Sequence, residues 1–216
     1  MRFGVLGTGM VGTTIATKLV ELGHQVTMGA RSADNESAVA WAQGAGDSGA
    51  SGTFADAAAG AEMVLNCTAG GGTLSALEMA GPDNLEGKVL IDVSNPLDFS
   101  HGMPPRLSVV NDDSLGEQIQ RAYPGTRVVK ALNTVNCRVM VDPSLVPGDH
   151  DLFMCGNDDG AKASVVELLG GFGWSQDRVV DLADITGARA MEMYLPLWLR
   201  LMGVVGGPDF NVRVVR

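Results

Sequence analysis

The amino-acid sequence predicts an α/β fold with a doubly wound, mostly parallel sheet and a small C-terminal α/β cap. Short apolar runs alternate with stretches of helical periodicity, which is the pattern of repeated β-α-β units. Glycine makes up 29 of the 216 residues, and several of these glycines directly follow the apolar runs. The chain is 45% hydrophobic and 19% charged, which suits one large domain with a small appendage and excludes a disordered chain.

The first three predicted elements are a strand, a helix and a second strand. Residues 3–6 form an apolar run that ends in glycine, which is typical of a buried strand. Apolar residues then recur at helical spacing over residues 11–22, and Gly23 supplies a C-cap. Residues 25–28 give the second strand, so the chain opens with one complete β-α-β unit.

The next segment is predicted to hold a helix and then a loop. Residues 35–43 can form a helix, with Ser32 or Asp34 as its N-cap. Residues 44–52 are rich in glycine, serine and alanine, and we expect a mobile surface loop there. The earlier pattern then repeats, with strands at 63–66, 89–93 and 127–132 and helices at 74–79 and 115–122. Helices that connect parallel strands are expected on both faces of the sheet.

The character of the chain changes after residue 143, and we place a domain boundary near residue 145. Residues 146–216 would then form a small C-terminal domain that completes a cleft. In this part we expect a strand at 152–155, a helix at 162–169 closed by Gly170 and Gly171, and an apolar helix at 185–201 that is kinked at Pro196.

A glycine-rich turn joins the first strand to the first helix. It reads G-x-G-x-x-G over residues 7–12, in the strand-turn-helix context of a dinucleotide-binding fold. Gly7 permits the tight turn, Gly9 lets a pyrophosphate approach the backbone, and Gly12 lets the helix pack close to the strand. We therefore predict a Rossmann-type dinucleotide-binding domain over residues 1–145. Its first cofactor-binding residues are Gly7, Thr8, Gly9, Met10, Val11 and Gly12.

The end of the second strand indicates a preference for NADP over NAD. NAD enzymes usually place an acidic residue there to accept from the ribose hydroxyl groups. This chain instead has Ala30, Arg31 and Ser32, and its first carboxylate is Asp34. A guanidinium can bind a 2′-phosphate through two hydrogen bonds, which a carboxylate would repel. We expect Arg31 to make this contact.

Polar residues follow three further predicted strands. Ligands of open α/β sheets bind at the carboxyl ends of the strands, so these residues are expected to line the same cleft. The predicted cofactor-binding residues at these ends are Asn66, Cys67, Thr68, Ala69, Asn95, Pro96, Asn133 and Thr134. We also treat Asn133 as a candidate positioning residue for the reaction.

Charge and cysteine content exclude several classes of partner. The net charge is −10, which argues against nucleic acid and against an anionic membrane surface. Three cysteines at wide spacing form neither a disulfide framework nor a zinc motif, so we expect no metal and a reducing, cytoplasmic location.

We find no motif for acid–base catalysis. The three histidines are scattered, and neither tyrosine belongs to a Tyr-x-x-x-Lys pair. Hydride transfer between two bound cofactors needs no such group, because the cofactors carry the chemistry.

Several of these segments occur together in one known family. They are GTGMVG at 7–12, LGH at 22–24, GAR at 29–31, DVSNPL at 92–97, VVKALNT at 128–134, CGNDD at 155–159, PLW at 196–198 and GG at 206–207. With them the chain resembles, nearly from end to end, the coenzyme F420-dependent NADP oxidoreductase family.

The resemblance implies hydride transfer between NADP(H) and F420 in a protein that is usually dimeric. Thr8 and Arg31 would bind the 2′-phosphate. A second-substrate cleft would be lined by Asn133, Val135, Gly206, Gly207 and Pro208.

Two alternatives remain open at this point. Ala30, Asn35, Asn133 and the turn at 68–70 depart from the family pattern. An NADPH-dependent reductase of flavin, ferric chelate or a small organic substrate is therefore an alternative, and a non-catalytic NADP-binding regulatory module is a second.

Overall fold

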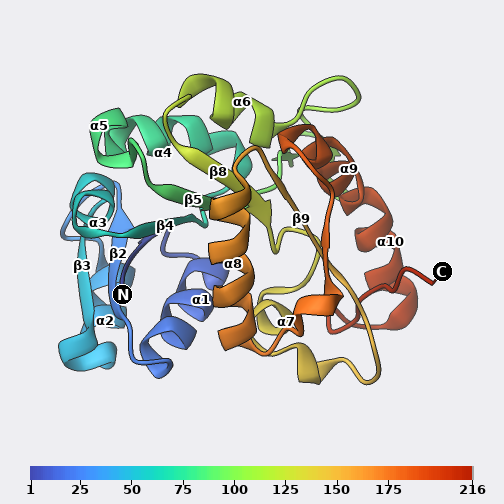
Figure 1. The fold of residues 1–216 in the computed structure, drawn as a ribbon, viewed down its shortest axis with the longest axis horizontal. Coiled ribbons are helices and arrows are strands. Elements are labelled where there is room, and N and C mark those ends of the chain that lie inside the picture. Colours follow the sequence, from blue (N-terminus) through green and yellow to red (C-terminus); the bar gives the residue numbers. More distant parts are fainter. Residues whose placement is uncertain (216) are drawn as a thin grey trace.

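One eight-stranded sheet runs through the computed structural model, which describes residues 1–215 (Figure 1). Its strand order is β10-β9-β8-β5-β4-β1-β2-β3. The strands are β1 (Arg2–Leu6), β2 (Gln25–Ala30), β3 (Gly49–Thr53), β4 (Met63–Asn66), β5 (Val89–Asp92), β8 (Arg127–Ala131), β9 (Leu152–Gly156) and β10 (Val179–Asp181). A separate short hairpin pairs β6 (Leu97–Asp98) with β7 (Arg106–Leu107).

The sheet is parallel apart from one pairing. Strands β3, β2, β1, β4, β5 and β8 pair in parallel, and β9 alone runs antiparallel to its neighbour β8. The order of the six parallel strands is that of a doubly wound dinucleotide-binding sheet, whose switch point lies between β1 and β4. The predicted fold class is confirmed.

Helices cover both faces of the sheet. On one face lie α1 (Met10–Glu21), α2 (Glu36–Ala45), α7 (Cys137–Val141) and α8 (Asp159–Phe172). On the other lie α3 (Phe54–Gly60), α4 (Thr73–Ala80), α5 (Pro82–Leu85), α6 (Leu115–Ala122) and α9 (Ala188–Met193). The helical spacing predicted for α1 brings Ile15 and Leu19 fully into the core, which stabilises the fold by about 1.5–3 kcal/mol for each side chain.

The loop predicted over residues 44–52 is wrong. Residues Gly46–Ser48 form a 3-10 turn, and β3 begins at Gly49 and pairs with β2. The small residues reflect close packing rather than mobility, because a Cβ at Gly49 would overlap the Cβ of Ala45 on α2. The helix that follows, α3, was not predicted, although Thr53 and Asp56 form a capping box at its start.

Other element boundaries also differ from the predictions. The N-cap of α2 is Asn35, whose side chain accepts from the N–H of Ala38 at 3.0 Å, in place of Ser32 or Asp34. Helix α8 continues through the two predicted closing glycines to Phe172, and Gly173 is its C-cap.

The C-terminal helix predicted over 185–201 is divided into three pieces. They are a 3-10 turn (Ile185–Gly187), α9 and α10 (Leu195–Val205). The break falls at Tyr194, and Pro196 lies in the first turn of α10, where its missing N–H is tolerated. Strand β10 was also not predicted.

The boundary near residue 145 stays a prediction. Strands β9 and β10, which follow it, extend the same sheet as the first six strands. Among residues 1–215, none of the helices has both the length and the apolar composition that a membrane-spanning helix needs.

An ion pair between Glu117 and Arg189 joins α6 to α9. Arg189 donates to the two carboxylate oxygens at 2.8 and 2.6 Å, and the hydroxyl of Ser114 donates to one of them at 2.7 Å. The carboxylate is almost completely buried. The guanidinium of Arg189 holds the pKa of Glu117 below its ordinary value.

Glu117→Gln should lower the free energy of unfolding near neutral pH by about 2 kcal/mol, because charge-assisted hydrogen bonds are lost. The folded-state pKa is lowered, so this stabilisation is present above the unfolded-state pKa and disappears as the pH falls through the folded-state pKa. Urea unfolding of both proteins at a series of pH values measures the difference.

The matched control is Asp149→Asn, which breaks more exposed pairs with Arg178 and Arg213 and should cost less than about 1 kcal/mol. If the difference in free energy of unfolding between wild type and Glu117→Gln stayed constant as the pH fell, the role given to the Glu117 carboxylate would be contradicted.

Candidate functional site

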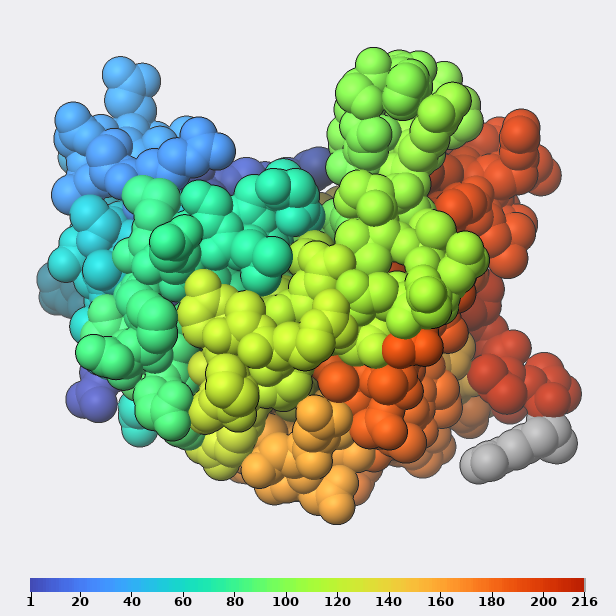
Figure 2. All heavy atoms as spheres, turned by 90° about the horizontal axis from the view of Figure 1, so that it is seen from above, coloured from blue at the N-terminus to red at the C-terminus, as the bar shows by residue number. Residues whose placement is uncertain are grey.

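A cleft of about 460 Å³ opens at the carboxyl ends of β1, β2 and β4. This is the switch point of the sheet, where open α/β proteins bind ligands. In Figure 2 a hollow separates the light-blue segment that includes α2 from the green projection that contains the β6–β7 hairpin. The residues that line the cleft are Gly7, Thr8, Gly9, Ala30, Arg31, Ser32, Asn35, Phe54, Cys67, Thr68 and Ala69.

The glycine turn of the cleft has the form that the sequence predicts. Gly7 has a φ of 116° and its N–H donates to the carbonyl of Gly29 at 2.9 Å, which ties β1 to β2. A Cβ at Gly12 would overlap the carbonyl oxygen of Gly7, so α1 can start this close to β1 only with glycine. At Gly9 a Cβ would meet no atom within 4 Å. The space beside Gly9 is therefore open to a ligand.

The start of α1 adds the polar part of the cleft. Gly9 is the N-cap residue, and no side chain caps the helix. The first N–H groups of the helix are therefore available to an anion, as they are in dinucleotide-binding folds. Met10 is 70% exposed, and Val11 is half-buried against the core.

Arg31 lies at the end of β2 with its side chain exposed to the cleft. Within residues 1–215 its guanidinium makes no ion pair, whereas Asn35 beside it is occupied in capping α2. Asn35, named above only as a departure from the family pattern, and Phe54 also line the cleft, although neither is among the predicted cofactor-binding residues. The signal for Asn35 was its place as the N-cap of α2, and the signal for Phe54 was its place at the start of α3, a helix that was not predicted.

A buried lysine lies beneath the cleft. Lys130, on β8, is fully buried and donates to Oδ2 of Asp92 and to the carbonyl oxygen of Ser94, both at 2.6 Å. A third contact, at 2.8 Å, joins its ammonium to Oε1 of Glu192 on α9. Burial by itself lowers the pKa of Lys130, but the two carboxylates outweigh it and the pKa lies above its ordinary value. All three N–H groups of the ammonium have an acceptor.

The Asp92 carboxylate continues this network toward the cleft. Its Oδ1 accepts from Nδ2 of Asn66 at 2.7 Å, and Oδ1 of Asn66 accepts from the hydroxyl of Thr68 at 2.7 Å. Thr68 lines the cleft, whereas Asn66 is completely buried. Asn66, predicted as a cofactor-binding residue, therefore lies one layer below the cleft and orients a residue that lines it.

Cys67 lies beside the glycine turn. A Cβ at Gly7 would come within 2.8 Å of its carbonyl oxygen, so the two turns are in close contact. Burial and, to a smaller extent, the charge of Asp92 raise the pKa of the Cys67 thiol. Such a thiol stays protonated and has little nucleophilic character.

The ends of β5 and β8 meet through two asparagines. Nδ2 of Asn95 donates to the carbonyl of Asn133 at 2.9 Å, and Nδ2 of Asn133 donates to Oδ1 of Asn95 at 2.9 Å. Asn133 also donates to the carbonyl of Met191 on α9 at 3.1 Å. Leu132, just before it, has a φ of 66°, a conformation that is costly without glycine and is concentrated at functional sites.

Five buried polar atoms lack a hydrogen-bond partner within the described residues, and they fall in three segments. The atoms are Asn133 Oδ1, Thr134 Oγ1, Tyr194 OH, Trp198 Nε1 and Asp209 Oδ1. The loop after β8 contacts α9 through the Asn133–Met191 bond, and the ring of Trp198 stacks on that of Phe210, with centroids 5.4 Å apart. An unpaired buried polar atom costs about 1–3 kcal/mol, so each of these atoms is a candidate partner for a ligand or a water molecule.

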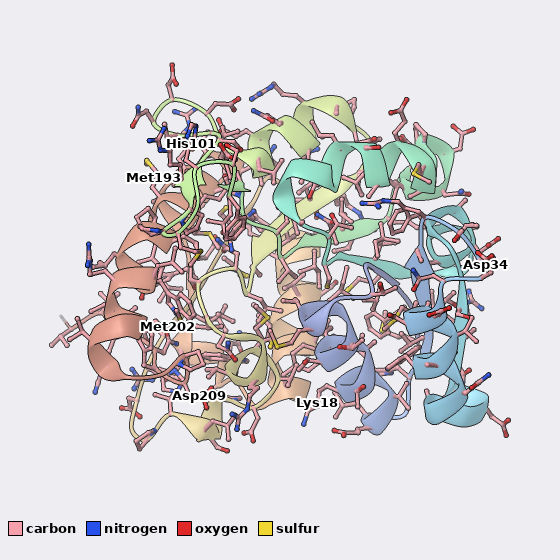
Figure 3. All side chains as sticks on the ribbon, turned by 180° about the vertical axis from the view of Figure 1, so that it is seen from behind. Lys18, Asp34, His101, Met193, Met202 and Asp209 are labelled. Atoms are coloured by element: carbon pink, nitrogen blue, oxygen red, sulfur yellow. The ribbon has the colours of Figure 1, made fainter. Side chains whose placement is uncertain are left out.

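The remaining predicted residues are neighbours of these segments along the chain. Pro96 follows Asn95, Val135 follows Thr134 and is buried, and the predicted run Gly206–Gly207–Pro208 leads from α10 to Asp209. In Figure 3, Asp34, near the β2 end of the cleft, lies on the opposite side of the molecule from Met202 and Asp209. His101 belongs to the β6–β7 hairpin. Residues 1–215 contain no cluster of three His, Cys, Asp or Glu side chains that could hold a metal ion.

Alanine at two motif glycines should separate folding from ligand binding. Gly12→Ala should reduce the free energy of unfolding by at least about 1–3 kcal/mol, because the methyl group overlaps a backbone carbonyl. Gly9→Ala should cost less than about 1 kcal/mol. It should nevertheless weaken dinucleotide binding at least about tenfold, because the methyl group enters the open cleft.

Thermal unfolding and titration with NADPH measure the two effects. Wild-type affinity for NADPH in Gly9→Ala would show that the ligand does not approach the backbone at this turn.

Several comparisons with known proteins name the same family, and one relative of another kind, the metalloreductase STEAP3 of Rattus norvegicus, is 27% identical over 202 residues, which are 91% of this chain and 38% of that protein. The model of the family described as NADP oxidoreductase, coenzyme F420-dependent, matches residues 2–96. The F420-dependent NADP reductase of Methanocaldococcus jannaschii is 30% identical over 130 residues, which are 60% of this chain and 56% of that protein. The chain therefore spans little more than half the length of this relative.

Two further comparisons cover nearly the whole chain. The F420-dependent NADP reductase of Methanothermobacter marburgensis is 30% identical over 220 residues, with 93% of this chain and 92% of that protein covered. A solved structure from Arthrobacter sp. FB24, described as a candidate F420-dependent NADP reductase, is 50% identical, covers 100% of both chains and superposes with a TM-score of 0.94. This chain belongs to the family of coenzyme F420-dependent NADP oxidoreductases.

Proposed function

We propose that this protein is an NADP-dependent oxidoreductase that transfers a hydride between NADP(H) and coenzyme F420. The observation that carries the proposal is the cleft at the β1–β4 switch point, open at Gly9 and bearing an unpaired Arg31 where NAD enzymes usually have a carboxylate. Membership of the F420-dependent family supports the choice of both substrates.

The residues of the cleft fit NADP(H). The open space at Gly9 and the uncapped start of α1 suit the pyrophosphate, which binds to backbone N–H groups. Arg31, with the hydroxyl groups of Thr8 and Ser32, would bind the 2′-phosphate. Of the remaining predicted residues, Ala30 and Ala69 would contact the cofactor through their backbone and methyl groups, as part of the cleft wall.

The unpaired polar atoms beside α9 and α10 support a second substrate with amide-like groups. Deazaflavins carry carbonyl oxygens and an N–H on one edge of the ring system. The hydroxyl groups of Thr134 and Tyr194 and the indole N–H of Trp198 can donate to such carbonyls, and Oδ1 of Asn133 can accept from the N–H. This side of the site would also include Val135 and the run Gly206–Gly207–Pro208.

The chain itself would orient the two substrates and exclude water. NADPH supplies the hydride when it is bound, and F420 accepts it. The charged groups beneath the cleft are engaged with one another, since the ammonium of Lys130 is saturated by Asp92, Ser94 and Glu192. The hydride passes between the two substrates, and the proton that completes the reduction of F420 would come from solvent, so neither these groups nor the protonated thiol of Cys67 needs to supply it.

We also propose that the protein is a cytoplasmic homodimer. Helix α10 buries only Leu195, and Leu197, Val204 and Val205 are 54%, 77% and 59% exposed. An exposed apolar helix on an acidic chain is typical of an interface. A second copy of the chain would cover it, and the three free cysteines would stay reduced in the cytoplasm. Sedimentation of the purified chain measures its oligomeric state.

The proposed reaction can be followed directly. Mixing the protein with NADPH and F420 should bleach the visible absorbance of oxidised F420. Absence of bleaching beyond the rate without enzyme would contradict F420 as the acceptor. Parallel assays with FMN, ferric citrate and small carbonyl compounds distinguish a reductase of another substrate from a protein that binds NADPH without turnover.

Arg31→Ala should weaken the binding of NADPH much more than the binding of NADH. A charge-assisted hydrogen bond contributes roughly 1.5–3 kcal/mol, which corresponds to about 10- to 150-fold in affinity for the phosphorylated cofactor. Titrations with NADPH and NADH measure the two dissociation constants. Arg31→Lys is the matched control and should retain part of the preference, because the point charge remains. Equal losses for the two cofactors would show that Arg31 does not bind the 2′-phosphate.

A further inference from the structure

We propose that Lys130 is a positioning residue for the reaction. It acts through Asp92 and Asn66 on Thr68, and through Ser94 on the neighbouring turn that carries Asn95. This inference rests on the proposed function. Lys130 itself is fully buried and does not line the cleft, so it can act on the reaction only through other residues.

The first branch of the network ends at the dinucleotide side of the site. Lys130 fixes Oδ2 of Asp92 at 2.6 Å, and Oδ1 of the same carboxylate holds the amide of Asn66 at 2.7 Å. The amide orientation is thereby determined, with Oδ1 of Asn66 toward the turn. There it accepts from the hydroxyl of Thr68 at 2.7 Å and from its N–H at 3.3 Å. The rotamer of one lining residue thus depends on an ammonium two side chains away.

The second branch ends at the other side of the site. Lys130 donates to the carbonyl of Ser94, whose own hydroxyl and N–H both contact Asp92 at 2.7 and 3.2 Å. The next residue, Asn95, is paired with Asn133 by two hydrogen bonds. Lys130 and Asp92 therefore hold both the turn with Thr68 and the turn with Asn95.

The third contact of the ammonium reaches the C-terminal part of the chain. Glu192 on α9 binds Lys130 at 2.8 Å and also accepts from the N–H groups of Leu115 and Gly116 at 2.8 and 3.0 Å. One positive and two negative side chains are thus buried together, and the first turn of α6 offsets the excess negative charge. Because Asn133 contacts the neighbouring Met191, α9 is tied to the second-substrate side as well.

This arrangement suits orientation better than stability. Buried ion clusters can often be replaced by apolar residues without loss of stability, so their best-attested use is to specify one arrangement. Here both branches end at residues predicted to contact the substrates. A displacement of about 1 Å between reacting groups can reduce a rate by about 10²-fold, so an error in the relative position of the two turns would act on the transfer step.

The test uses the double variant Lys130→Met with Glu192→Gln, which removes one charge of each sign and leaves the net charge of the cluster unchanged. Lys162→Met is the control, because Lys162 is another buried lysine with two carboxylate partners, Asp159 and Asp181, away from the cleft. Amide hydrogen exchange of residues 67–72, 94 and 95 in the substrate-free protein gives a readout that does not depend on activity.

We expect exchange in both turns to become at least about tenfold faster in the double variant and to stay unchanged in Lys162→Met. We also expect kcat to fall by about 10²-fold, with a much smaller change in KM for NADPH. A folded double variant with wild-type exchange in both turns would overturn the proposal. The proposal would also be overturned if Lys162→Met lost as much stability as the double variant and showed the same fall in kcat.

If the double variant does not fold, Thr68→Val and Thr68→Ser test the end of the first branch. Serine keeps the hydroxyl that reaches Asn66, so it should keep wild-type exchange in the turn, whereas valine should not. Equal exchange in the two variants would overturn the proposal. The exchange measurement does not depend on the reaction. If the proposed function is wrong, the wild-type protein will not reduce F420, but the exchange rates will still test the role of Lys130.

Discussion

A single buried ammonium, that of Lys130, holds together the parts of the chain that form the site. It lies on β8 and binds the end of β5, the turn after it and helix α9, with all three contacts at 2.6–2.8 Å. Removing one partner of a buried ion pair typically costs about 3–5 kcal/mol, because the other charge is left without compensation. We propose that these contacts favour one arrangement of the three segments and thereby position both sides of the cleft.

Around this network the two sides of the site are built differently. The dinucleotide side consists largely of backbone: Gly7 and Gly12 allow close packing, and the space beside Gly9 is open. The segments at 133–134, 194–198 and 209 hold buried polar atoms that have no partner among residues 1–215, and such atoms are costly unless a substrate or water pairs with them. A protein that orients two substrates for a hydride transfer needs both features, and it needs them at a fixed separation.

The sequence predicted the parts of this site that depend on local patterns. The apolar runs identified the central strands, and the G-x-G-x-x-G spacing identified the turn, because both signals lie within a few consecutive residues. Strand β3 and helix α3 were not predicted, because the small residues of this edge strand have the composition of a loop and only their packing shows otherwise. The role of Lys130 could not be predicted, since Asp92 and Glu192 meet it only through pairings between distant segments. The one local sign was a lysine inside an apolar strand.

We propose that the chain positions two substrates for direct hydride transfer between them. The most direct test uses NADPH carrying deuterium at one of the two C4 positions, with F420 in ordinary water, and mass spectrometry of the reduced F420. Direct transfer predicts that one of the two labelled forms delivers its deuterium to C5 of F420 and that the other delivers none. Loss of the label to the solvent from both forms would contradict direct transfer between the two bound molecules.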